Sequence, residues 1–80
     1  MTLEEILENY GDVEFLKADG FDDAVIGIEQ TMYRLVYDID KMVRILIERD
    51  GMTDEEAFEF LDYNVIGAYV GEKTPLYIQS

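Results

Sequence analysis

Two short patterns of the form Thr-x-x-Glu constrain the fold most, because each marks where a helix begins. Thr2 precedes Glu5, Thr53 precedes Glu56, and apolar residues with helical spacing follow both pairs. In such a capping box each side chain accepts a hydrogen bond from a backbone N–H that would otherwise be unpaired at the helix start. The chain therefore has two predicted helix starts, and the predicted helices cover 3–10 and 54–67.

The sequence between these helices contains strand patterns followed by a further helix pattern. β-branched and aromatic residues predict strands at 24–29 and 33–37, and the short connection between them favours a hairpin. Apolar residues recur with helical spacing over 39–49, after Asp38 or Asp40 as the capping residue.

The segment after the first helix has a weaker helical pattern. We expect one or two further helical turns within 12–19, with Asp12 as the cap and Gly20 as the stop. Phe15 and Leu16 would then be the contacts of this segment with the core.

With a last short strand expected at 76–78, the element order is α-β-β-α-α-β. This order predicts an α+β fold, in which a three-stranded, mostly antiparallel sheet packs on two to three helices. The length of 80 residues is typical of one small domain, so we expect residues 1–80 to form a single domain.

The charge balance excludes several classes of function. The chain has 19 acidic and 6 basic residues and a net charge of −13. Binding of nucleic-acid phosphates or anionic lipid needs clustered Lys and Arg, so neither nucleic acid nor a membrane surface is an expected direct partner. There is no long apolar run and no basic leader at the start, and the absence of Cys favours a reducing cytosol.

Side chains that commonly perform catalysis are scarce. The chain contains no His and no Cys, and its one Ser is the terminal Ser80. Neither a glycine-rich phosphate loop nor a complete calcium loop occurs, although Asp38-Ile39-Asp40 and Asp50-Gly51 resemble fragments of the latter. We therefore expect no enzyme activity, no cofactor and no metal site, and we interpret these Asp residues as helix caps and turn residues.

The acidic residues are concentrated in two stretches. Residues 1–33 hold nine acidic residues and one basic residue, and residues 50–62 hold six acidic residues and no basic one. Residues 34–49 hold three acidic and four basic residues, so a nearly neutral segment separates the two stretches. Such a distribution favours a directional acidic surface.

Five acidic residues are candidates for contact with a partner. Glu55, Glu59 and Asp62 share the outer face of the predicted 54–67 helix, about 4.5 to 6 Å apart along the axis, which resembles the spacing of phosphates on a nucleic-acid strand. Asp22 and Asp23 are the candidates in the first acidic stretch. The alternative interpretation is that the outer face of this helix is simply solvated.

A second group of candidates lies near the C-terminus. Asn64 falls within the apolar arc of its predicted helix, where an amide must find hydrogen-bond partners. It is either a satisfied internal polar group or helix-end residue, or a ligand-contacting amide beside Tyr69. Glu72 and Thr74, in the turn that follows, complete this candidate ligand or interface site.

Two longer motifs resemble a known family. Residues 49–57 (RDGMTDEEA) and 63–75 (YNVIGAYVGEKTP) are similar to a family of small proteins from tailed phages and prophages, and the similarity extends from about Gly20 to Ile78. The resemblance implies a phage origin and the cytosol of a bacterial host. It implies no particular activity, although small acidic phage proteins are often accessory factors and some block host defence enzymes.

Three hypotheses of function follow. The first is a protein-binding module that inhibits a host defence or nucleic-acid-handling protein with a basic surface, through an acidic and in one version DNA-mimicking face. The second is a small-ligand binder or sequestering oligomer, with its pocket near Asn64, Tyr69 and the Gly71–Pro75 turn. The third is a structural homo-oligomer without a ligand.

Overall fold

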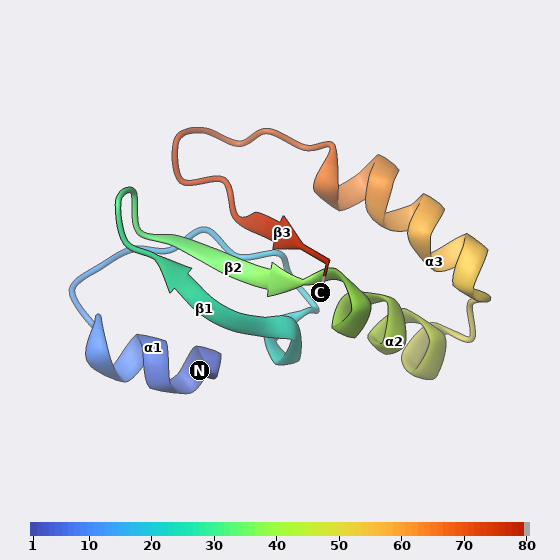
Figure 1. Cartoon of the computed structure of the whole chain (residues 1–80), viewed down its shortest axis with the longest axis horizontal. Coiled ribbons are helices and arrows are strands. Elements are labelled where there is room, and N and C mark those ends of the chain that lie inside the picture. Colours follow the sequence, from blue (N-terminus) through green and yellow to red (C-terminus); the bar gives the residue numbers. More distant parts are fainter. Residues whose placement is uncertain (80) are drawn as a thin grey trace.

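The computed structural model describes residues 1–79, which form a three-stranded sheet flanked by helices (Figure 1). The elements in chain order are α1 (Leu3–Asn9), the 3-10 turn η1 (Asp22–Ala24), β1 (Val25–Glu29), β2 (Arg34–Asp38), α2 (Ile39–Asp50), α3 (Asp54–Leu61), the π-helical segment η2 (Asp62–Ile66) and β3 (Leu76–Ile78). The predicted α+β class and the order of the main elements are confirmed.

Both capping boxes form as predicted. The hydroxyl of Thr2 accepts a hydrogen bond from the backbone N–H of Glu5, and the Glu5 carboxylate accepts one from the N–H of Thr2. Thr53 and Glu56 make the same reciprocal pair at the start of α3. These local bonds place the starts of α1 and α3 within one residue of the sequence prediction.

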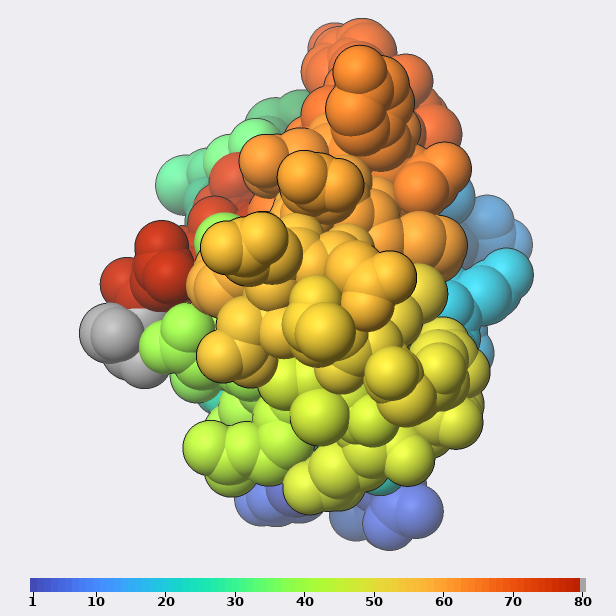
Figure 2. Space-filling view, turned by 90° about the vertical axis from the view of Figure 1, so that its right-hand side faces the viewer, coloured from blue at the N-terminus to red at the C-terminus, as the bar shows by residue number. Residues whose placement is uncertain are grey.

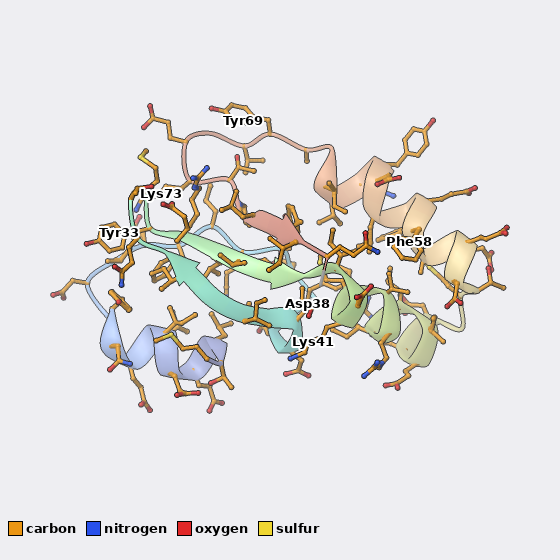
Figure 3. The ribbon with its side chains drawn as sticks, in the orientation of Figure 1. Tyr33, Asp38, Lys41, Phe58, Tyr69 and Lys73 are labelled. Atoms are coloured by element: carbon orange, nitrogen blue, oxygen red, sulfur yellow. The ribbon has the colours of Figure 1, made fainter. Side chains whose placement is uncertain are left out.

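The caps of α2 identify which of the two candidate Asp residues begins this helix. Asp38 is the capping residue, because its carboxylate accepts hydrogen bonds from the backbone N–H groups of Asp40 and Lys41. Gly51 ends the helix in the left-handed conformation, with a φ of 69° that favours glycine. In Figure 3, Asp38 and Lys41 lie close together at this junction between β2 and α2.

The sheet is mixed, with strand order β1-β2-β3. β1 and β2 form the predicted antiparallel hairpin, with a bulge between Val25 and Gly27. β3 pairs with β2 in parallel, after the chain has passed through α2 and α3. The antiparallel arrangement expected for most of the sheet therefore applies to the hairpin pair, and the second pair is parallel.

The hairpin turn is stabilised by Glu29, although it lacks an Asn-Gly signal. The Glu29 carboxylate accepts hydrogen bonds from the backbone N–H groups of Thr31 and Met32, from the Thr31 hydroxyl and from Arg34 Nε. These bonds, led by that of the Thr31 side chain, lower the pKa of Glu29 to about 2. Tyr33, at the outer end of the hairpin in Figure 3, has a φ of 57°.

The core lies between the sheet and the helices and forms one cluster of buried side chains. Tyr37 is its largest fully buried member, and Leu35 lies two residues away on the same face of β2. α1 supplies Leu3 and Ile6, whereas the other contributions are Phe21, Ala24, Val25, Met42, Val43, Leu46, Ala57 and Leu61. No helix within residues 1–79 is long and apolar enough to cross a membrane.

The helical turns expected within 12–19 do not form. Residues 13–18 are irregular, and Val13 and Phe15 alternate with the exposed Glu14 and Leu16. Phe15 packs against the core as expected, whereas Leu16 is 40% exposed. The helix prediction failed because the backbone of this segment bonds to distant groups, such as the Tyr37 hydroxyl that accepts from the N–H of Ala18 at 2.9 Å.

The helix expected over 54–67 changes character at Leu61. Residues 62–66 are π-helical, and the backbone N–H of Gly67 donates to the carbonyl oxygen of Asp62, five residues earlier, at 3.2 Å. Gly67 permits this bond, because a Cβ atom there would lie 2.8 Å from the Asp62 oxygen. The change of helix type rotates the last turn relative to an α-helix and so alters which side chains face the core.

Candidate binding surface

The carboxylates of Glu55, Glu59 and Asp62 lie on an uncovered face of the molecule. Glu55 and Glu59 are exposed on α3, whose Ala57 and Leu61 are buried, and Asp62 is exposed at the start of η2. Figure 2 shows α3 and η2, in yellow and orange, at the middle and top of this face without another element over them. We call these three residues the acidic stripe.

Few of the acidic side chains have a basic neighbour. Within residues 1–79, ion pairs join Arg34 to Glu29 and Arg49 to Asp50, at 3.0 and 3.1 Å. The other described carboxylates, including those of the acidic stripe, have no basic side chain within ion-pair distance. The negative charge of the stripe is therefore available to a partner.

Asp22 and Asp23 lie apart from the acidic stripe. Both are exposed in η1, which contacts α2, whereas α3 packs on α2 as a separate neighbour. They line one hollow with the C-terminal half of α2, and a second hollow of about 540 Å³ with the N-terminal residues and Lys41. The structure thus keeps together the three candidates from the second acidic stretch and places the two from the first elsewhere.

The prediction that Asn64 lies within an apolar arc was wrong. Asn64 is exposed, and its side-chain amide donates to the carbonyl oxygen of Phe60 at 3.1 Å. Asn64 lies within the π-helical segment, where the α-helical spacing behind the prediction no longer applies. The neighbouring Tyr63 is 89% exposed, and an α-helix of 3.6 residues per turn would also place it opposite Ala57 and Leu61, so the spacing in the sequence indicates this exposure.

A groove opens beside η2, between residues 16–21 and residues 60–77. Its volume is about 480 Å³. Most of its lining is apolar, and Asp19, Lys17, Asn64 and Thr74 add polar groups. We call it the apolar groove, and its lining comprises Leu16, Lys17, Ala18, Asp19, Phe21, Phe60, Asn64, Val65, Ala68, Val70, Thr74, Pro75 and Tyr77.

A shallower hollow of about 450 Å³ adjoins the apolar groove. We call it the acidic hollow, and its lining comprises Met52, Glu56, Glu59, Phe60, Tyr63 and Asn64. Phe60 and Asn64 line both depressions. An apolar depression and one with two carboxylates thus lie on either side of the same two side chains.

Hydrogen bonds explain most of the Gly71–Pro75 turn. The Thr74 hydroxyl donates to the carbonyl oxygen of Gly71 at 2.6 Å and accepts from the N–H of Val70 at 2.9 Å. Lys73 Nζ donates to the carbonyl oxygen of Glu14 at 3.1 Å, which ties this turn to the segment that leads into the other wall of the groove. Glu72 is exposed and lines another hollow with Lys73, which shares Leu16 and Val70 with the apolar groove.

Tyr69 does not line the groove. It is 78% exposed, and Figure 3 shows it on the outer side of the connection between η2 and β3. Its neighbours Ala68 and Val70 line the groove instead. Of the C-terminal candidates, the structure brings Asn64 and Thr74 to one groove and leaves Tyr69 and Glu72 outside it.

The wall formed by residues 16–21 is held by the buried Tyr37 of β2 and the exposed Arg49 of α2. The buried Tyr37 hydroxyl holds Ala18, and burial raises the pKa of that hydroxyl. Arg49 donates from Nη1 to the carbonyl oxygen of Gly20 at 2.9 Å and lies over the Phe21 ring, 5.6 Å from its centroid. Burial also raises the pKa of Tyr77, which stacks on Tyr37 with ring centroids 5.7 Å apart.

Comparisons with known proteins do not assign the chain to a family. No family model matches the chain, and no curated protein or solved structure matches it. Within residues 1–79, no group of three or more acidic side chains is gathered as a metal site would require. The arrangement offers a surface for binding: exposed carboxylates beside an apolar groove and an exposed aromatic ring.

Proposed function

We propose that this chain is a protein-binding module whose partner is a host protein with a basic surface. The observation that carries the proposal is that Glu59 of the acidic stripe lines the acidic hollow together with the exposed Tyr63, and that this hollow adjoins the apolar groove. In keeping with the resemblance to phage proteins, we propose that it is a phage accessory factor in the bacterial cytosol. Its partner would be a defence or nucleic-acid-handling protein, and binding would inhibit it.

The physical argument has an electrostatic and an apolar component. Carboxylates without basic neighbours attract a basic partner over a distance of about one Debye length and accelerate association, more so at low salt. Charge alone gives little affinity, whereas buried aromatic and apolar anchors supply most of it at protein interfaces. Tyr63, 89% exposed and next to Asp62, supports such an anchor within the same surface.

Two triple variants with the same change in net charge test the proposal. The variant E55Q/E59Q/D62N neutralises the acidic stripe, and E4Q/E8Q/D12N neutralises three exposed carboxylates in and after α1. Each is immobilised and used to capture proteins from bacterial lysate at low and high salt, and the captured proteins are identified and titrated after purification. We expect one basic protein to bind the wild type and the α1 variant, and to bind the stripe variant much more weakly. Equal loss in both variants, or no salt-sensitive capture by the wild type, would reject the proposal.

The DNA-mimicking form of this proposal predicts competition between this protein and DNA. The acidic stripe would then occupy the nucleic-acid site of the partner, so duplex DNA and this protein would compete for it. Competition measured with a labelled DNA duplex tests this form. Simultaneous binding of both would leave a protein-binding module that does not mimic DNA.

The apolar groove supports a second candidate function, the binding of a small molecule. Its volume of about 480 Å³ lies in the range of ligand pockets, and it combines apolar walls with a few polar groups. Thermal unfolding in the presence of a broad panel of nucleotides and metabolites tests this candidate, since a ligand raises the melting temperature. A panel without any shift would remove it.

Light scattering on the same samples tests the homo-oligomer hypothesis, which predicts a mass above that of one chain.

A further inference from the structure

The apolar groove and the acidic hollow are adjacent depressions. Phe60 and Asn64 contribute to both linings and form the border that the two depressions share. On one side are the side chains of Val65, Val70 and Pro75, and on the other is the carboxylate of Glu59.

We infer that this surface binds a single peptide segment of a partner protein, which inserts a large apolar side chain into the apolar groove and places a Lys or Arg in the acidic hollow. The inference rests on the proposed function and specifies where and what the module binds. The anchor would lie against Val65, Ala68 and Val70. The basic side chain would lie beside Glu59, within reach of the Tyr63 ring that a cation favours.

Charge complementarity selects this occupant over the alternatives. A second copy of the chain also carries a net charge of −13 and would meet the carboxylates of Glu56 and Glu59 with like charge. Nucleic acid would meet them with phosphates. A basic segment that carries an apolar anchor is attracted by the acidic hollow and buries the apolar lining, so both depressions favour it.

The walls of the groove are already in place. Ala18 is held by Tyr37, Gly20 by Arg49 and the Gly71–Pro75 turn by Thr74. Lys73 also joins this turn to residue 14 across the surface, at 3.1 Å. A segment that docks here therefore meets a preformed groove, which lowers the entropic cost of binding.

Selection from a random peptide library tests the inference. A displayed library of 12-residue peptides is selected on the wild-type protein at low salt, and the affinities of synthetic copies are then measured by fluorescence polarisation. We expect the enriched peptides to share a large apolar residue within a few positions of Lys or Arg.

Two single variants test the apolar groove. We expect Ala68→Trp, which fills the groove, and Val70→Glu, which places a charge in it, each to weaken peptide binding at least tenfold. Both sites are exposed, so folding should persist, and circular dichroism checks it.

A charge-reversal pair tests the acidic hollow. Glu59→Lys and Glu8→Lys change the net charge equally, and both residues are exposed in helices and make no side-chain hydrogen bond or ion pair within residues 1–79. We expect Glu59→Lys to weaken binding at least tenfold and Glu8→Lys to weaken it less than threefold. Equal effects, or a folded Ala68→Trp protein that binds the peptides normally, would overturn the inference while the proposed function could still stand. The absence of any basic peptide among the binders would reject both.

Discussion

At the residue scale, a few side chains join segments that are far apart in the sequence. Tyr37 in β2 holds Ala18, Arg49 at the end of α2 holds Gly20, and Lys73 holds Glu14. None of these pairs has a local sequence signal, because each depends on how the sheet and helices pack. They explain why residues 13–18 do not form the helical turns expected from sequence.

Replacement of Tyr37 by Phe tests the most buried of these bonds. The change removes the acceptor for the N–H of Ala18 and leaves that group unpaired, so we expect a loss of about 1 kcal/mol in the free energy of unfolding. Urea denaturation followed by circular dichroism measures it. Tyr63→Phe is the control, because the hydroxyl of the exposed Tyr63 has no such role. Equal stabilities for the two variants would contradict the account of this wall.

Replacement of Gly67 by Ala tests the origin of the π-helical segment. The new Cβ would lie 2.8 Å from the Asp62 carbonyl oxygen, so the backbone of residues 62–66 must shift. We expect large amide chemical-shift changes confined to η2 and the walls of the apolar groove, whereas Gly27→Ala, which places a Cβ in open space, should leave η2 unchanged. An unchanged η2 in the Gly67→Ala protein would show that Gly67 does not determine the helix type.

At the element scale, the sequence predicts starts better than ends. The sequence predicts the starts of the three α-helices at their capping residues, Thr2, Asp38 and Thr53. These starts are predictable because each capping bond joins residues at most three positions apart. The end of α3 and the parallel pairing of β3 with β2 could not be predicted from local patterns. The end of α3 depends on the close approach of Gly67 to Asp62. The direction of β3 depends on the position at which the chain reaches the sheet again after α2 and α3.

The same limit applies to the candidate site. Glu55 and Glu59 were placed correctly on an exposed helix face, since α3 is amphipathic over its whole length. The apolar groove could be anticipated only through Asn64 and Thr74, because its walls come from residues 16–21 and 60–77 and meet only in the folded chain.

The hairpin turn has a pH dependence that Glu29 determines. The pKa of Glu29 is about 2 in the folded chain, whereas the ordinary pKa of a Glu carboxyl group is 4.5. Folding therefore favours the charged form of Glu29. The resulting stabilisation is complete above about pH 5 and is lost as the pH falls from 4.5 towards 2. We therefore expect Glu29→Gln to destabilise the protein relative to the wild type at pH 6 and much less at pH 2.5, as measured by urea denaturation. Glu8→Gln is the control. A deficit of the same size at both pH values would contradict this assignment.

At the scale of the whole molecule, the central feature is a large negative charge with little internal compensation. The two described ion pairs involve Glu29 and Asp50, and neither belongs to the acidic stripe. The hydrogen bonds from Arg49 lower the pKa of Asp50, and they pair the Asp50 carboxylate with a basic side chain of the same protein. Of the remaining carboxylates, that of Asp38 is buried at the start of α2, whereas those of the acidic stripe are exposed, and Glu59 lies next to the border of the apolar groove.

This distribution predicts that different acidic faces are not equivalent in binding. α1 and η1 together hold five acidic residues and α3 holds four, but of these three elements α3 alone contributes side chains to both the apolar groove and the acidic hollow. A partner attracted by charge alone would contact all three. A partner held by charge and an apolar anchor would remain on α3 and η2.

Mapping a bound peptide by nuclear magnetic resonance tests this claim most directly. The labelled protein is titrated at low salt with the tightest-binding peptide from the library selection, and amide shifts are followed for each residue. The account predicts that the largest changes fall in residues 59–70 and 16–19, with small changes in α1 and η1. Changes spread over α1, η1 and α3 alike would contradict it, because they would show that the acidic surface acts without a directional binding face.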